Sequence, residues 1–570
     1  MKRRFLLYVN IAVAAVAMLA SCNKSDDGVV CINATINDYG NNDKVYVDND
    51  RYTWWNDQDQ VYINGTTYAL TVSNNIATIA NVTADQNGYY AVYPAGMCGT
   101  AANGYPTVTL PQRQVYRTDG TNQILNAPMA DFSGNEHPAL NFTNLCSLLK
   151  VTLPDDRLVA AIVVSNTTAN LWGTCTLSGT DNPTLSTPAN GGKTVMLDCG
   201  DGVSSANGKP FYVVLPGTNL SNLQVKVIVY KTVSGVKYTE IYDKQSTANP
   251  QLVPNMVYTF SVPTTATYTE PYFSTASRTH VRFAPGNLQY QASTSTWRFA
   301  PNEWEAYGNG GGNTAPSATN ENWIDLFSYG TSGETFTYTT GLWPLQQNHT
   351  TVNNYPWTND GGLASATNGH FYDGNISSTE YDWGWHNPIS NGGNAVHLWR
   401  TPTKEEWYYL IADRSSDAHL ADSRDMPRGS GIPQASLASI TLEGGSTVGG
   451  LIIFPDNVTL AVGDNVSNLT ANRSTKTWDE WRYLDLNGAA FLPYSAIRNG
   501  PYGLVRRNTE ISEVNTGQYW SGSTSGAGTD LQLQSSHIIF PTGLLNNSLD
   551  PRQGSFRYWG LAVREVQTIQ

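Results

Sequence analysis

Three acidic side chains lie close together in the segment "YDGNISSTEYDWG" (372–384), at Asp373, Glu380 and Asp382. Carboxylates gathered in this way suit either a calcium site or the pair of acids that hydrolyses a glycosidic bond. A simpler interpretation is that they are turn and cap residues, because Asp and Asn occupy turns for their own hydrogen bonding. We expect turn and cap residues here, with metal or acid–base chemistry as the alternative.

The histidines and glycines form no motif with known chemistry. The nearest set of histidines has neither H-x-H nor H-E-x-x-H spacing: His280, His349, His370, His386 and His397. The glycine-rich "YGNGGGN" (307–313) lacks the Lys-Ser/Thr pair that a phosphate-binding loop requires. We therefore expect no catalytic residue, no metal site and no cofactor.

The thiols are confined to the first part of the chain. The six cysteines are Cys22, Cys31, Cys98, Cys146, Cys175 and Cys199. None has the C-x-x-C spacing of a zinc site. If Cys22 is modified, an odd number remains, so at least one thiol is unpaired. Cys175 and Cys199 could form a disulfide.

The N-terminal residues indicate export. Three basic residues (2–4) precede an apolar run that ends in "LASC" (19–22), which is the pattern of a secretory signal rather than of a membrane-spanning helix. The run resembles a bacterial lipobox, and "CNKSDD" (22–27) resembles the surface-export signal of Bacteroidetes lipoproteins. These resemblances imply a signal peptide over residues 1–21 and a lipidated tether over residues 22–29. They also imply lipidation at Cys22, a lipid anchor in the outer membrane, and a surface-exposed lipoprotein.

The composition favours β-structure and excludes one class of partner. Only 14% of the 570 residues are charged, and Gly, Asn, Thr, Ser and Tyr are abundant, as expected of strands joined by polar turns. The net charge of −13 argues against nucleic acid, which binds to basic surfaces. No segment after the signal is long and apolar enough to cross a bilayer.

Short alternating segments such as "VYING" (61–65) and "FYVVLPG" (211–217) follow one another in the first half, with polar turns between them. This spacing predicts two β-sandwiches, over residues 30–138 and 139–263. The Thr- and Pro-rich stretch that follows predicts a linker over residues 264–271. Most tryptophans lie beyond it, which indicates a second kind of domain.

Several motifs in the first half occur in the order of a known family: "YYAVYPA" (89–95), "LPQRQVY" (110–116), "NFTNLCSLLKVTLP" (141–154) and "LVPNMVYTFSV" (252–262). Over residues 30–263 the chain resembles fimbrillin, the subunit of Bacteroidetes surface pili. The resemblance implies transthyretin-like sandwiches, and assembly with pilus subunits by donor-strand exchange. An unpolymerised stalk is an equal alternative. Asn255 stands where the family usually has Gly, and we expect the turn to persist because Asn tolerates positive φ.

The second half contains two helix-start motifs. Thr403 with Glu406, and Thr477 with Glu480, have the spacing of a capping box. After the first box, the spacing of Trp407, Leu410 and Ile411 predicts a helix that buries one face. The second helix should end at Gly488. A closing strand in "GLAVREV" (560–566) is expected beside the opening strand in "HVRFAP" (280–285).

Four motifs of this half resemble one family: "RFAPGNLQY" (282–290), "LWRTPTKEEW" (398–407), "GAAFLP" (488–493) and "RYWGLAVR" (557–564). This is the Bacteroidetes branch related to the Fibrobacter major paralogous domain. It shares its fold with formylglycine-generating enzymes and with the variable proteins of diversity-generating retroelements. The resemblance implies a C-type-lectin-like head over residues 272–567. The enzymes of this fold oxidise through cysteine thiols, so the lack of cysteine after residue 199 excludes that activity here.

The resemblance also implies a ligand-binding surface between residues 521 and 555. Trp520, Gly560, Ala562 and Val563 flank this stretch as framework residues, and in the retroelement-diversified relatives the ligand-contacting positions lie within it. The resemblance assigns the role of ligand contact to Ser523, Ser525, Thr529, Asp530, Gln532, His537, Asn546, Asn547, Arg552 and Arg557. The alternative is a plain surface loop over a rigid core.

We expect a multidomain chain of two all-β transthyretin-like sandwiches followed by an α+β C-type-lectin-like domain. Its expected function is that of a non-enzymatic surface adhesin or fimbrium-tip lipoprotein, which binds a glycan or a protein on host or neighbouring cells. Two alternatives stay open: a carbohydrate-active or other hydrolytic enzyme, and a structural pilus subunit. A pair of carboxylates in a pocket would favour the enzyme, whereas a shallow face without perturbed carboxylates would favour the adhesin.

Overall fold

The structure is a computed structural model of the chain, which divides into two compact units. Unit 1 is Met1–Val229, Tyr242–Tyr268 and Ala461–Asp464, and unit 2 is Tyr230–Ile241, Thr269–Leu460 and Asn465–Gln570. The described residues are 29–36, 40–41, 59–73, 76–100, 105–116, 127–134, 138–246, 249–276, 279–291, 294–306, 323, 325–327, 329–330, 332, 374–413, 433–495, 497–499, 504–506, 516–524, 534–541, 550–556 and 560–569.

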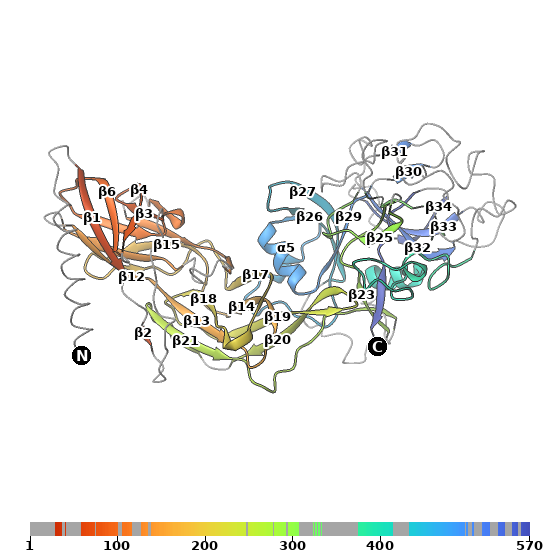
Figure 1. The fold of residues 1–570 in the computed structure, drawn as a ribbon, viewed down its shortest axis with the longest axis horizontal. Helices are drawn as coiled ribbons and strands as arrows, with labels where there is room; N and C mark the ends of the chain where they lie inside the picture. Colours follow the sequence, from red (N-terminus) through yellow and green to blue (C-terminus); the bar gives the residue numbers. More distant parts are fainter. Residues whose placement is uncertain are drawn as a thin grey trace. The chain divides into compact units, whose positions relative to one another are not determined.

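Unit 1 is built from β-sheets (Figure 1). Its eight-stranded sheet has the order β4 (Thr66–Ala69), β3 (Gln60–Ile63), β7 (Tyr89–Tyr93), β11 (Met129–Ser133), β12 (Ala139–Asn144), β1 (Val29–Ile36), β6 (Ile76–Thr83) and β5 (Thr71–Ser73). Along β1, Val30, Ile32 and Ala34 are buried, because alternate side chains of a strand point to the same face. The alternation predicted for residues 61–65 and 211–217 does not hold there, because Val61–Ile63 and Phe211–Pro216 are buried at successive positions.

Three smaller sheets complete the strands of the first half. A five-stranded sheet contains β10 (Arg113–Val115), β17 (Thr194–Ser204), β14 (Leu158–Ser165), β19 (Gln224–Val233) and β20 (Val236–Gln245). A four-stranded sheet contains β18 (Phe211–Pro216), β13 (Cys146–Thr152), β21 (Met256–Ser261) and β2 (Gly40–Asn41). Another contains β16 (Thr184–Leu185), β15 (Gly173–Ser178), β9 (Pro106–Leu110) and β8 (Cys98–Thr100).

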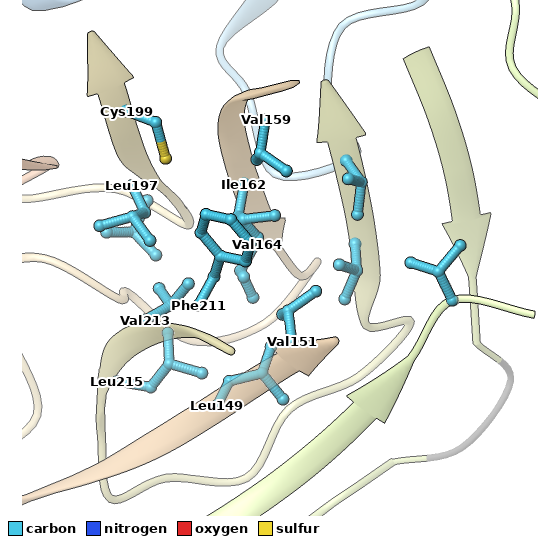
Figure 2. Close-up of a cluster of buried hydrophobic side chains, with 14 of the residues drawn as sticks. Leu149, Val151, Val159, Ile162, Val164, Leu197, Cys199, Phe211, Val213 and Leu215 are labelled. Carbon is cyan, nitrogen blue, oxygen red and sulfur yellow. The ribbon is translucent and has the colours of Figure 1, made fainter. Parts of the chain in front are cut away.

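An aliphatic core holds several of these strands together. Figure 2 shows side chains of β13, β14, β17 and β18 pointing toward one another, with Ile162, Leu197 and Phe211 among them. Strand β14 lies between β17 and β19 in its sheet. It is buried on both faces, and its sequence is a nearly continuous apolar run, as such burial requires. Burying each such Val, Leu or Phe side chain contributes about 1.5–3 kcal/mol to folding.

The predicted boundary between residues 138 and 139 does not separate two sets of sheets. Strand β12 follows that boundary but pairs with β1 and β11 in the eight-stranded sheet. Strands β9 and β10 precede it but pair with β15 and β17. The alternation of side chains locates strands but does not say which strands pair, so this boundary could not be read from it.

Two details of the first half test predictions about single residues. Asn255 has a φ of +62°, so the expected turn forms without glycine. Cys175 is a free thiol, like Cys98 and Cys146, so the predicted disulfide between Cys175 and Cys199 is not formed. They lie on different strands and in different core clusters. Cys31 is disulfide-bonded.

Unit 2 combines short helices with small sheets. The helices are α2 (Trp383–His386), α3 (Lys404–Tyr408), α4 (Val466–Leu469) and α5 (Trp478–Leu486), and a π-helical segment covers Tyr409–Asp413. One sheet contains β22 (Phe273–Ala276), β23 (Thr279–Phe283) and β35 (Val566–Ile569), and another contains β28 (Ser474–Lys476), β26 (Ala435–Thr441), β27 (Thr447–Ile453) and β29 (Ala490–Pro493). Strands β32 (Thr516–Thr524), β33 (Gln534–Pro541) and β34 (Asp550–Phe556) form a further sheet. Two strand pairs are β24 (Leu288–Gln291) with β25 (Thr296–Phe299), and β30 (Ile497–Asn499) with β31 (Leu504–Arg506).

Both predicted capping boxes are present. The Thr403 hydroxyl accepts a hydrogen bond from the Glu406 amide at 3.2 Å, and the Glu406 carboxylate accepts one from the Thr403 amide at 2.9 Å. Thr477 and Glu480 do the same at the start of α5. The predicted apolar stripe of the first helix is buried, at Trp407, Leu410 and Ile411. These starts could be predicted because a capping box involves only neighbouring residues.

The closing strand pairs antiparallel with the opening strand, as predicted, but it lies further along the chain. Strand β35 covers Val566–Ile569 and pairs with β23, whereas residues 560–565 run outside it as buried backbone. Unit 2 has an aromatic core of its own, which includes Trp383, Trp399 and Trp520. The transthyretin-like and C-type-lectin-like assignments stay predictions.

The predicted linker contains the point where the chain passes from one unit to the other, between Tyr268 and Thr269. Unit 2 nevertheless differs from the predicted head, because it also takes Tyr230–Ile241, the tip of the β19–β20 hairpin. The tip turns at Ser234 and Gly235, which both have positive φ, as a two-residue hairpin turn requires. Across the residues described above, no helix is both long and apolar enough to cross a membrane.

Candidate ligand-binding site

Most of the predicted ligand-binding residues lie outside the described part of the chain. Ser525, Thr529, Asp530, Gln532, Asn546, Asn547 and Arg557 belong to this group, and so does the lipidation residue Cys22. His537 and Arg552 lie on β33 and β34, where only the backbone is described. The ligand-binding surface over residues 521–555 therefore stays a prediction.

Ser523 is the one member of that set with a described side chain, and it belongs to the framework. It is buried, and its hydroxyl accepts a hydrogen bond of 3.1 Å from the Lys404 amide at the start of α3. The expected framework residues are buried around it: Trp520, Ala562 and Val563. Because its hydroxyl is occupied within the protein, we do not retain Ser523 as a ligand contact.

The acidic cluster predicted from sequence is described only in part. Asp373 lies outside the described residues, and Glu380 is exposed. Asp382 is buried at the start of α2, where it accepts hydrogen bonds from the amides of Ser378 and Thr401 at 2.9 and 3.0 Å. Asp382 occupies the N-cap position of α2, but its side chain forms no cap hydrogen bond there; it binds the amides of other segments instead, and the acid close to it is Glu565.

Asp382 and Glu565 form a pair around Thr401. The Thr401 hydroxyl lies 2.8 Å from Asp382 Oδ1 and 3.3 Å from Glu565 Oε1, and it donates to these carboxylates. Burial raises the pKa of Asp382 to about 6, and burial together with the charge of Asp382 raises the pKa of Glu565 well above its usual value. Both side chains are fully buried, and a Cβ added at Gly384 would lie 3.0 Å from Glu565 Oε2. This pair has no access for a substrate, so we assign it to the fold.

The described histidines do not converge on a metal. His280 stacks on Tyr272 with ring centroids 4.0 Å apart, and His397 packs against Trp385 at 4.8 Å. His349 and His370 lie outside the described residues. Within the described ranges, no group of three or more His, Cys, Asp or Glu side chains is placed to hold a metal ion.

A cavity of about 280 Å³ lies within unit 2, at a place that we did not predict from sequence. Its lining comes from the hairpin tip, from strands β22 and β23, from the segment after β25, and from helix α5. Trp304 and Trp478 line it and contact each other edge to face, with ring centroids 5.4 Å apart and an interplanar angle of 87°. The capping box at Thr477 fixes the start of α5 and thereby the position of Trp478.

Acidic side chains of the lining are each held by an arginine. Glu303 Oε1 accepts from Arg564, whose side chain is fully buried, and Glu303 Oε2 accepts from the Phe491 amide at 2.8 Å. Burial outweighs the attraction of Arg564 and raises the pKa of Glu303 to about 8. Asp485 Oδ2 lies 2.9 Å from Arg482 Nη1. Arg482 also donates to the Tyr230 hydroxyl, at 3.0 Å.

Three buried donor atoms of the lining have no hydrogen-bond partner within the described structure: Trp478 Nε1, Tyr238 Oη and Arg282 Nε. The Arg282 guanidinium lies 4.7 Å from the centre of the Tyr238 ring, and its Nη1 lies 2.9 Å from Glu270 Oε1. A buried donor without an acceptor destabilises a protein by about 1–3 kcal/mol. All three atoms are themselves buried, so they do not offer hydrogen bonds to the space of the cavity.

Sequence reasoning missed this site because its parts are distant along the chain. Glu303 and Arg564 are 261 residues apart, and Tyr238 belongs to a hairpin that we assigned to the preceding sandwich. The available signal was the repeated pairing of Trp with acidic residues in "NEWEAYG" (302–308) and "TWDEWRYL" (477–484). That signal also suits simple packing, so it did not distinguish a site from a core.

Comparison with known proteins adds little. No protein-family model matches the chain, and no curated protein matches it. Among solved structures, it is similar to candidate cell adhesion proteins from three species of Bacteroides. For the protein from B. ovatus the identity is 11%, over 42% of this chain and 94% of that chain, with a TM-score of 0.29. For the protein from B. eggerthii the identity is 14%, over 44% of this chain and 96% of that chain, with a TM-score of 0.22. For the protein from B. thetaiotaomicron the identity is 11%, over 41% of this chain and 94% of that chain, with a TM-score of 0.22. Similarity this weak does not establish a shared fold, so we transfer no function from it.

Proposed function

We propose that this protein is a non-enzymatic adhesin on the cell surface, and that unit 2 is its ligand-binding part. The observation that supports this function is the cavity in unit 2, which is lined by the rings of Trp304 and Trp478 and by three cationic side chains, at Lys237, Arg282 and Arg482. Aromatic rings bind apolar faces, and cationic donors bind oxygen acceptors. A lining with both features suits reversible recognition of a small ligand or of one protruding group on a larger partner.

Hydrolysis is the second candidate, and one observation favours it. Glu303 and Asp485 line the same cavity, and a carboxyl with a pKa of about 8 has the proton that a general acid needs. Both Glu303 oxygens, however, are occupied by Arg564 and the Phe491 amide, and Asp485 is paired with Arg482. Neither acid is free to protonate a leaving group or to attack a substrate, so binding is the better account.

The function is tested by exposing the full chain to glycan and protein arrays and recovering what binds. Trp304→Ala should abolish or greatly weaken capture, because it removes an aromatic ring from the lining of the cavity. The matched control is Tyr105→Ala, at an exposed tyrosine that lines a cavity in unit 1, and it should not change capture. Capture that is insensitive to Trp304 would contradict the proposal. Recovery of a cleaved ligand, lost in Glu303→Gln, would favour the hydrolase.

The surface location is part of the same proposal and rests on the lipobox at residues 19–22. Several acyl chains on Cys22 would hold the protein firmly in the outer membrane, where it would stand alone as a stalk or at a fimbrium tip. Cys22→Ser should move nearly all the protein out of the membrane fraction. Cys98→Ser is the matched control, since Cys98 is a free thiol on strand β8, and it should leave membrane partitioning unchanged. Membrane retention of Cys22→Ser would contradict lipidation.

A further inference from the structure

Unit 1 contains a cavity of about 550 Å³ beside its eight-stranded sheet. Tyr62 on β3 and Phe132 on β11 line it, and so does Tyr90 on β7, the strand between them. Phe132 pairs with Tyr90, and Tyr62 pairs with the residue two positions beyond Tyr90. Paired residues, and residues two positions apart on a strand, point to the same face of a sheet. The three rings therefore project from one face.

A fourth ring makes the aromatic lining accessible. Tyr105 precedes β9 and is 43% exposed, so a ligand can reach its ring. Phe132 is partly buried and contacts Tyr90 edge to face, with ring centroids 5.9 Å apart. The Tyr90 hydroxyl donates to the Gly179 carbonyl at 2.6 Å, which holds that ring in place. Aromatic faces attract cations, because their π-electrons present negative charge.

The charge of the lining has the sign that a cation requires. Among the described residues that line this cavity, Asp85 is the one charged side chain. It is partly exposed, and its carboxylate accepts hydrogen bonds from neutral donors, the Asn64 side chain at 3.0 Å and the Asn87 amide at 2.8 Å. A carboxylate has about four acceptor positions, so these two bonds leave room for a further contact.

Several donors of the lining are already in use, which disfavours a ligand rich in acceptor oxygens. The Asn64 side-chain amide donates to Asp85 and also to the Gly88 carbonyl, at 2.8 Å. The hydroxyls of Tyr62 and Thr100 form a hydrogen bond with each other. A sugar or an anion needs free donors, whereas a cation needs negative charge and aromatic surface. The lining therefore suits a cation with apolar substituents.

We propose that the cavity in unit 1 binds a quaternary ammonium group. Its positive charge lies between the Asp85 carboxylate and the ring of Tyr105, and its methyl groups pack against Phe132. Such a group has no N–H to satisfy, so a carboxylate and aromatic rings are sufficient to replace its water. The cavity volume is within the range of about 300–1,000 Å³ that is usual for small-molecule sites. This site is separate from the cavity in unit 2 and does not rest on the adhesin function.

The test is a ligand-observed NMR titration of the full chain with choline and with 3,3-dimethyl-1-butanol. The second compound has the shape of choline, with a carbon atom in place of the charged nitrogen. We expect choline to bind at least about fivefold more tightly, because the neutral compound loses both the cation–π contact and the attraction of the carboxylate. The preference should decrease with added sodium chloride, because part of it is electrostatic.

Two variants locate the effect. Asp85→Asn keeps the size of the side chain and removes its charge, so it should abolish most of the preference for choline. Tyr105→Ala removes an exposed ring and should weaken choline binding about threefold or more. Asp156→Asn is the matched control for the charge, because Asp156 is exposed, accepts a hydrogen bond from the Ser204 hydroxyl and does not line the cavity. It should change neither affinity.

Cosedimentation with phosphatidylcholine vesicles distinguishes the source of the group. Cosedimentation that is lost in Asp85→Asn would assign a lipid headgroup, and binding of choline without cosedimentation would assign a free amine.

Three results would overturn the inference: no binding of choline, equal binding of the two compounds, or a preference that Asp85→Asn leaves intact. Trp304→Ala should not alter choline binding, since Trp304 lines the other cavity. Failure of this inference would leave array capture dependent on Trp304, whereas failure of the adhesin proposal would leave choline binding dependent on Asp85.

Discussion

The two units each contain a cavity, and the two cavities differ in the state of their polar groups. The cavity in unit 1 is larger, at about 550 Å³, and is lined by Tyr62, Asn64 and Tyr90 among others. Its polar groups are used within the protein: the Asn64 amide donates to Asp85 and to the Gly88 carbonyl, and the Tyr90 hydroxyl donates to the Gly179 carbonyl. Among the described residues of its lining, no buried side-chain polar atom lacks a partner.

The cavity in unit 2 is about half that volume but has three buried donors without partners. Volume alone would have selected the other cavity. What distinguishes the smaller cavity is its lining, which combines the rings of Trp304 and Trp478 with three cationic side chains, at Lys237, Arg282 and Arg482.

The largest effect should come from Arg564, whose fully buried guanidinium holds Glu303 at the cavity of unit 2. Removing one partner of a buried ion pair destabilises a protein by about 3–5 kcal/mol. We expect about 3 kcal/mol from Arg564→Met, the lower end, because Glu303 can take up a proton. Chemical denaturation measures this loss. The counterpart in unit 1 is Asp85→Asn, at an exposed hydrogen bond, which should lower stability by less than about 1 kcal/mol. Similar losses at the two sites would remove the contrast between the cavities.

An effect on the order of 2 kcal/mol is expected from pH, through the fully buried pair Asp382 and Glu565. Both carboxyls have a higher pKa in the folded protein than in the unfolded chain. Their contribution to stability is then complete below about pH 4 and is lost as pH rises through about 6. The melting temperature of unit 2 should therefore fall between pH 4 and pH 8.

The pH experiment has two matched variants. Glu565→Gln removes one titrating group and should flatten the pH dependence, whereas Glu443→Gln, at an exposed position, should leave it unchanged. A stability that rises with pH over this range would show that the pair is ionised when folded.

The smallest change in stability is expected from removing a tyrosine hydroxyl, and the two cavities each offer one. Tyr90→Phe in unit 1 removes a hydrogen bond of 2.6 Å to the Gly179 carbonyl and should lower stability by about 1 kcal/mol. Tyr238→Phe in unit 2 removes a buried hydroxyl that has no partner, so stability should stay the same or rise slightly. A clear loss of stability in Tyr238→Phe would show that its hydroxyl is bonded within the protein.

Local features of the fold were predictable from sequence, and those that depend on distant residues were not. The capping boxes at Thr403 and Thr477 and the turn at Asn255 each involve a few consecutive residues. Their energetics are therefore contained in the local sequence. The pairing of β12 with β1, in contrast, depends on which strands meet in three dimensions, and alternation of side chains does not encode that choice.

The candidate site shows the same limit more strongly. Tryptophan and acidic residues were visible at positions 304 and 478–480, but their convergence depends on Arg564 and Tyr238. Sequence also drew attention to Asp382 but not to its buried neighbour Glu565, because Glu565 lies 164 residues beyond Thr401, the residue that contacts both acids. Resemblance to families directed the search to residues 521–555, where Ser523 is the one predicted contact with a described side chain and forms part of the framework.

Because the hairpin tip Tyr230–Ile241 belongs to unit 2, it limits how the second half of the chain can be exchanged between proteins by recombination. Val236 is part of the aromatic core of unit 2, and Tyr230 and Tyr238 line its cavity. A gene fusion or recombination event that joined the chain at the Thr- and Pro-rich stretch would leave these residues behind. The transplanted segment would lack part of its core and part of its binding site. We therefore expect that functional exchange of the second half requires the hairpin to move with it, which makes the linker a poor point for natural domain shuffling.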